Sequence, residues 1–89
     1  MFKAYITVKI LDKRLMPGEA EEVLKGLAEY STAGLYIING TALRVTTQDA
    51  YTIVLEAYSE SLIGLLRAVK AVEEAFKAMY SAYVEITLQ

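Results

Sequence analysis

Two pairs of adjacent glutamates are the residues that come closest to acid–base chemistry. Glu21–Glu22 and Glu73–Glu74 each lie in a segment with helical periodicity. Neighbouring side chains on a helix point about 100° apart, so the carboxylates of a pair diverge instead of converging in a cleft. The first glutamate of each pair has a lysine four residues further on, Lys25 or Lys77, at the spacing that favours a surface ion pair. We interpret both pairs as solvated helix faces.

The remaining catalytic chemistry is limited by composition. The 89 residues include no histidine and no cysteine. These absences exclude imidazole bases, thiolate nucleophiles, disulfides and the usual transition-metal sites. The five glycines form no phosphate-binding motif. We therefore predict a non-enzymatic protein with no catalytic residues, no metal site and no cofactor.

Length and charge favour one α+β domain over residues 1–89. The chain is 55% hydrophobic and 22% charged, and charges interrupt every segment that approaches the length of a membrane span. The opening segment alternates from Phe2 and carries Lys3 and Lys9, unlike a signal peptide. We expect a cytoplasmic protein without a membrane span. The net charge of −2 disfavours nucleic acid as a partner.

Hydrophobic periodicity predicts the order β-α-β-β-α-β. Period-two alternation indicates strands at 2–11, 42–47, 51–58 and 82–88, and helical spacing indicates helices from Pro17 to about Ser31 and from Ser61 to Tyr80. Ser59 or Ser61 is expected to cap the second helix. The pair Asn39-Gly40 suits a hairpin turn or a bulge. We predict a two-layer sandwich: an antiparallel sheet of three to four strands with two helices on one face, as in ferredoxin-like folds.

Small residues form a line along the second predicted helix, which we call the small-residue seam. Its members are Gly64, Ala68, Ala71, Ala75, Ala78 and Ala82. Small side chains let another helix approach closely, so we predict a protein interface at Gly64, Arg67, Ala68, Ala71, Ala75 and Ala78. Two occupants remain open, the first helix of the same chain or a helix of a partner. The first helix has a single apolar stripe, which the sheet would largely use, and this observation motivates the second alternative.

The sheet face without helices is predicted to show tyrosines among basic residues. Tyr5, Arg44 and Tyr58 are the candidate contacts there, and such a face resembles a base-stacking platform for single-stranded RNA. Glu56 and Glu85 on the same face oppose that interpretation. A solvated face, or one covered by a second subunit, is the alternative.

The layout resembles the small Pcc-type subunit of KEOPS, an archaeal and eukaryotic complex that supports threonylcarbamoyl modification of tRNA adenosine. The matching segments are the strand AYITVKI, the acidic helix entry PGEAEEVLKGL, the strand YTIVLEAYS and the helix LIGLLRAVKAVEEAFKAM, with Leu-Arg-Ala at 66–68. The resemblance implies a dimerising scaffold, homodimeric or paired with a paralogue, whose helices bundle with the Kae-type catalytic subunit. Direct tRNA contact stays open. The alternative functions are a ferredoxin-like domain that binds single-stranded RNA and a ligand-sensing dimer.

Overall fold

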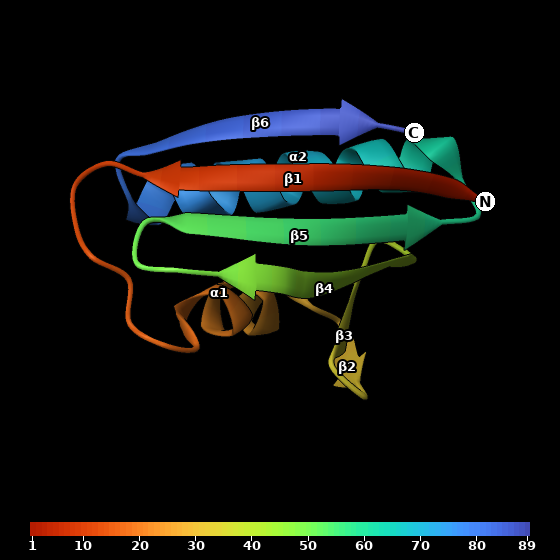
Figure 1. The fold of residues 1–89 in the computed structure, drawn as a ribbon. Coiled ribbons are helices and arrows are strands. Elements are labelled where there is room, and N and C mark those ends of the chain that lie inside the picture. Colours follow the sequence, from red (N-terminus) through yellow and green to blue (C-terminus); the bar gives the residue numbers. More distant parts are fainter.

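A computed structural model describes all residues from 1 to 89 and shows six strands and two helices (Figure 1). The elements are β1 (Phe2–Ile10), α1 (Glu19–Leu27), β2 (Tyr30–Thr32), β3 (Leu35–Ile38), β4 (Thr41–Gln48), β5 (Thr52–Ser59), α2 (Leu62–Met79) and β6 (Ala82–Leu88). The strands pair antiparallel in the order β2-β3-β4-β5-β1-β6. The predicted α+β class is confirmed, but the sheet has six strands instead of three to four.

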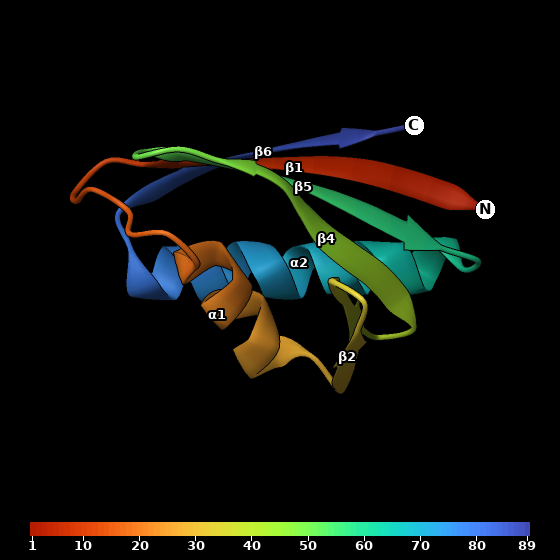
Figure 2. The same cartoon turned by 60° about the horizontal axis from the view of Figure 1, so that its bottom comes forward.

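The core lies between the sheet and the helices, which both cover the same face (Figure 2). Alternation along β1 places Ala4, Ile6 and Val8 on that face with no exposed surface. They meet a stripe of α2 that includes the fully buried Val72 and Phe76. Burial of these large side chains is the main term that stabilises a domain of this size. The opposite face of the sheet carries no helix.

The helix α2 begins and ends where the local sequence requires. The hydroxyl of Ser61 accepts a hydrogen bond from the Gly64 N–H at 3.1 Å, so Ser61 is the N-cap. No proline interrupts the helix, and it continues to Met79 before the chain turns into β6. The predicted helix is therefore confirmed to within a residue at each end. Neither helix is long and apolar enough to cross a membrane.

The segment after α1 differs from the prediction. The helix ends at Leu27 instead of near Ser31, and residues 30–38 form the hairpin of β2 and β3. Every residue of β2 is exposed, so this strand has no buried alternation for a sequence pattern to reveal. Its turn uses Ala33 and Gly34 at positive φ, and Asn39 and Gly40 do the same between β3 and β4. The Asn39-Gly40 pair therefore forms a hairpin turn, one of its two predicted roles.

Candidate interaction surfaces

The small-residue seam is only partly open. Ala68 is fully buried, and a Cβ placed on Gly64 would lie 3.0 Å from the Asn39 carbonyl oxygen. The β3–β4 turn therefore packs against the start of the seam. Of these two predicted interface positions, Ala68 lies in the core and Gly64 is half-buried beside the turn. Ala71 and Ala75 are half-buried, whereas Ala78 is exposed. Only the C-terminal part of the seam is accessible to a partner.

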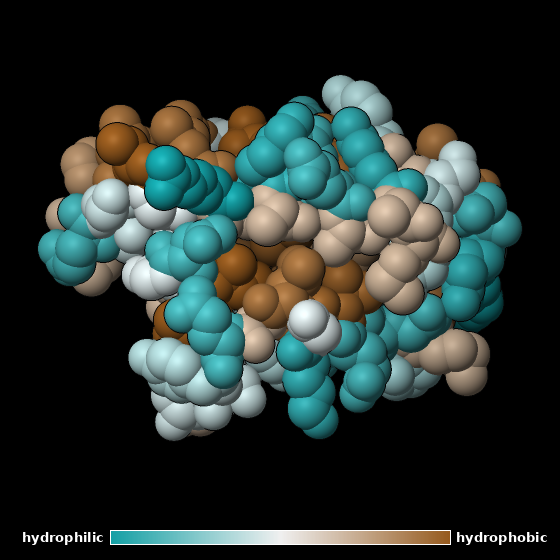
Figure 3. Space-filling model, turned by 180° about the vertical axis from the view of Figure 1, so that it is seen from behind, coloured by the Kyte–Doolittle hydropathy of each residue, from teal (hydrophilic) through white to brown (hydrophobic).

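This accessible part forms one wall of a groove between the two helices, which we call the α1–α2 groove. Its volume is about 630 Å³. The lining residues are Glu19, Glu22, Val23, Gly26, Leu27, Ala75, Ala78, Met79 and Tyr80. Figure 3 shows apolar side chains gathered in the middle of this helical side of the molecule. The floor is apolar, and the two glutamates make its α1 rim acidic.

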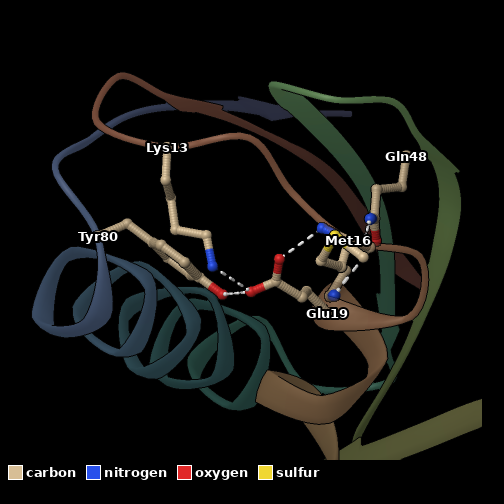
Figure 4. Close-up of polar contacts among 6 residues, drawn as sticks. Lys13, Met16, Glu19, Gln48 and Tyr80 are labelled. Atoms are coloured by element: carbon tan, nitrogen blue, oxygen red, sulfur yellow. Dashed lines mark hydrogen bonds and ion pairs between the residues drawn. The ribbon is translucent and has the colours of Figure 1, made fainter.

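Glu19 holds the end of this groove where α1 begins and α2 ends, through three hydrogen bonds (Figure 4). Its carboxylate accepts from the Met16 backbone N–H, from Lys13 Nζ at 3.0 Å and from the Tyr80 hydroxyl at 2.8 Å. These donors, the Met16 N–H first, lower the pKa of Glu19 to about 2. Burial, and then the Glu19 carboxylate, raise the pKa of Tyr80 to about 12. The three contacts join the β1–α1 loop to the ends of both helices.

The amide of Gln48 holds the same loop from the other side. Its Nε2 donates to the Met16 carbonyl at 2.8 Å, and its Oε1 accepts from the Ala20 N–H at 3.2 Å (Figure 4). One of the first N–H groups of α1 is thereby satisfied by a side chain of β4. The start of α1 is fixed to the sheet and to α2 together. The groove therefore has rigid walls at this end.

The open sheet face gathers its charged residues around Glu56. We call Lys3, Tyr5, Arg44, Glu56 and Tyr58 the Glu56 cluster. Arg44 pairs with the Glu56 carboxylate at 3.0 Å, Lys3 lies 3.9 Å from it, and the Tyr58 hydroxyl donates to it. Lys3 Nζ also lies 4.7 Å from the centre of the Tyr5 ring and 5.2 Å from that of Tyr58. The hydrogen bond from Tyr58 is the main cause that lowers the pKa of Glu56.

The structure thus brings the predicted contacts Tyr5, Arg44 and Tyr58 together, but around an acid. Glu56 is 7% exposed and accepts hydrogen bonds from Arg44 and Thr46, which both lie on the neighbouring strand β4. A nucleic-acid phosphate would have to displace the Glu56 carboxylate to bind Arg44 and Lys3. Ion pairs between a phosphate and solvent-exposed side chains are weak, so they would not repay this loss. This arrangement weighs against the RNA-binding alternative.

A third surface, at the free edge of β6, was not predicted. The Gln89 N–H donates to the Lys3 carbonyl, and the Leu11 N–H donates to the Ser81 carbonyl. Hydrogen-bonded pairs alternate in an antiparallel ladder, so the odd-numbered residues of β6 direct their backbone groups at β1. The even-numbered residues direct theirs outward, where no strand lies. They are Ala82, Val84, Ile86 and Leu88.

Apolar side chains accompany this free edge. Ile86 is 38% and Leu88 is 52% exposed, and on α2 Leu62 is 43% and Leu66 is 45% exposed. We call these four residues the β6 corner. Figure 3 shows apolar side chains at the upper left, where α2 begins and β6 ends. The sequence pattern predicted a strand at 82–88 and a helix from Ser61 to Tyr80, but it could not show that the sheet ends at β6 and leaves these residues exposed.

Comparison with known proteins gives a likeness of fold and no family. No protein-family model matches the chain. No curated protein matches it. Among solved structures, the aminopeptidase PepT from Bacillus cereus ATCC 10987 is similar over 99% of this chain, with a TM-score of 0.56 and 19% identity. The chain spans 29% of the length of that protein.

This likeness contradicts the prediction of a non-enzymatic protein. The same fold occurs within the chain of an aminopeptidase. A domain with this fold can therefore be part of an enzyme, and the absence of histidine and cysteine from it does not exclude that. The missing histidine and cysteine exclude certain catalytic groups among these 89 residues, but an enzyme's catalytic groups can lie elsewhere in its chain. At 19% identity the likeness shows the fold alone.

Proposed function

We propose that this protein is a docking domain whose α1–α2 groove receives a helix of a partner protein. The observation that carries the proposal is the pairing of an apolar floor, from Val23 and Leu27, with a wall of small residues at Ala75 and Ala78. A wall of alanines lets a partner helix approach closely, and the apolar floor would bury the apolar stripe of that helix, which favours binding. Helix-in-groove recognition is a common use of such a surface.

The rim of the groove defines the chemistry of the partner helix. Glu22 lies on the α1 rim, is exposed and makes no salt bridge. Glu19 adds a second carboxylate, although Lys13 partly neutralises it. Complementary charge favours a partner helix with an apolar stripe and basic residues along the flank that faces α1.

The resemblance to Pcc-type subunits supplies a specific partner for this proposal. In that family the helices bundle with the Kae-type catalytic subunit, and the assembly supports threonylcarbamoyl modification of tRNA. We propose the same role here, as a scaffold that docks a Kae-type subunit. The accessible end of the small-residue seam supports this role, because Ala78 is open to such a helix.

Titration calorimetry with the purified Kae-type subunit tests the proposal. The wild-type chain should bind, and Ala78→Glu should weaken binding by about tenfold or more, which equals ~1.4 kcal/mol. Gln89→Glu adds the same charge far from the groove and should bind like the wild type. Circular dichroism should show all three proteins equally folded. No binding by the wild type would reject the Kae-type partner, and unchanged binding by Ala78→Glu would reject the groove.

A further inference from the structure

We propose that two copies of this chain join through their β6 strands into one continuous antiparallel sheet, with Ile86 opposite the Ile86 of the second copy. The first observation is the difference between the two sheet edges. β2 has three residues, all exposed, with a polar sequence, and so offers little for another strand to extend. β6 has seven residues, with no proline, no lysine and one charge, Glu85.

Free edges of this kind are normally protected. Soluble proteins blunt them with lysine, proline, bulges or very short strands, because an open row of N–H and C=O groups recruits other strands. β6 has none of these devices, and its register with β1 is regular from Ala82 to Leu88. A second strand would satisfy the outward backbone groups of its even-numbered residues.

Two-fold symmetry restricts the possible registers. A two-fold axis perpendicular to the sheet makes the strands antiparallel and keeps both helical layers on the same face. An axis at Glu85 would place the two Glu85 carboxylates directly opposite each other, which is unfavourable. An axis at Ile86 instead places Val84 opposite the second copy's Leu88 and Glu85 opposite its Thr87. This register joins apolar residues on the helical face and leaves no like charges directly opposed.

The β6 corner indicates a second copy as the occupant instead of an isolated strand. Ala75 and Ala78 occupy the flank of α2 toward α1. Helical spacing places Leu62 and Leu66 on the other flank, where Leu66 also borders the outer face of α2 beside Ile63 and Lys70. An added single strand would satisfy the backbone of β6 but leave these leucines in water. A second copy brings its own α2 to the same face, and its leucines cover them across the axis. One dimer interface would therefore both bury the exposed apolar side chains and pair the free backbone groups of β6.

This dimer surface lies on the flank of α2 away from the α1–α2 groove. Its formation requires no docked partner, so the dimer and the docking proposal can fail separately. Light scattering behind a sizing column, with the purified chain alone at high micromolar concentration, gives the first test. The mass should be twice the 9.9 kDa of one chain. A mass of one chain would overturn the proposal.

Single cysteines test the register, since the chain has none of its own. Opposed hydrogen-bonded residues have Cα atoms ~5.5 Å apart, which suits a disulfide. Ile86→Cys should therefore cross-link to a covalent dimer under mild oxidation. The control Val84→Cys should not, because the two copies of residue 84 would be offset by four residues, or ~13 Å along the strand. Glu85→Cys should not cross-link either, because its Cα atoms would exceed disulfide range.

Two further outcomes complete the test. Cross-linking of Val84→Cys or Glu85→Cys in preference to Ile86→Cys would overturn the proposed register. Leu66→Lys changes an exposed residue of α2 and leaves β6 intact, so it should fold like the wild type by circular dichroism. It should halve the mass in light scattering. An unchanged dimer in a folded Leu66→Lys protein would overturn the role of the β6 corner.

Discussion

Two glycine-to-alanine changes test how α2 is held beneath the sheet. Gly26 lies near the end of α1, is exposed, and a Cβ there would meet no atom within 4 Å. Alanine should therefore stabilise the protein by about 0.5–1 kcal/mol, because it reduces the conformational freedom of the unfolded chain and favours the helix. At Gly64 the same gain is opposed by a contact with the Asn39 carbonyl oxygen at 3.0 Å.

The change in unfolding free energy expected for Gly64→Ala depends on which atoms must move to make room for the new Cβ. The contacting atom belongs to the backbone of the β3–β4 turn, so it cannot rotate away as the end of a side chain would. Overpacking of this kind costs about 1–3 kcal/mol. After subtraction of the helix gain, we expect Gly64→Ala to lose about 1 kcal/mol of unfolding free energy. The two variants should then differ by roughly 2 kcal/mol.

Urea denaturation followed by circular dichroism measures this difference, with thermal melting as a second readout. A change of 1 kcal/mol shifts the melting temperature of a domain of this size by ~4–8 °C. Gly26→Ala serves as the matched control for the substitution itself. If Gly64→Ala stabilised the protein as much as Gly26→Ala, the turn would not pack on the first turn of α2. The start of the small-residue seam would then be open to a partner after all.

Three further changes test the contacts that hold the fold. Glu19 has a folded pKa of about 2 against an ordinary 4.5, so it contributes stability above pH 4.5 that is lost as the pH falls toward 2. Glu19→Gln should therefore melt below the wild type at pH 7, and the gap should close near pH 2; a gap that persists there would refute the assignment. Ser61→Ala removes the N-cap of α2 and should cost about 1 kcal/mol in urea denaturation, whereas Ser81→Ala, outside any helix, should cost little. Phe76→Ala empties a fully buried site and should cost about 3–5 kcal/mol by the same assay, and a loss below 1 kcal/mol would contradict its place in the core.

The sequence predicts an element well where one face of it is buried. β1 alternates because its even-numbered residues from Ala4 to Ile10 lie in the core, and α2 shows helical spacing because one stripe meets the sheet. β2 has no buried residue, so no pattern separated it from the end of α1. The turn between β2 and β3 depends on Ala33 at positive φ, a conformation that alanine rarely adopts. An alanine in the sequence therefore gives no indication of such a turn.

The candidate surfaces depended on neighbours that a linear pattern does not contain. The seam was visible in the spacing of its alanines, but its cover at Gly64 comes from Asn39, 25 residues earlier in the chain. Glu19 belongs to the acidic helix entry PGEAEEVLKGL, but its bonds to Lys13 and Tyr80 follow only from the tertiary structure. The edge position of β6 likewise follows from strand order, which periodicity leaves open.

The pairing of β1 with both β5 and β6 has a consequence for synthesis on the ribosome. β1 precedes both strands that it pairs with, and one of these neighbours, β6, comes more than 70 residues later, at residues 82–88. Until those residues emerge, a nascent chain can complete the β1–β5 ladder but must leave the other side of β1 open. Contacts between segments so distant in sequence form slowly. During that interval β1 is a temporary edge and therefore the place where a chaperone would protect the nascent chain most usefully.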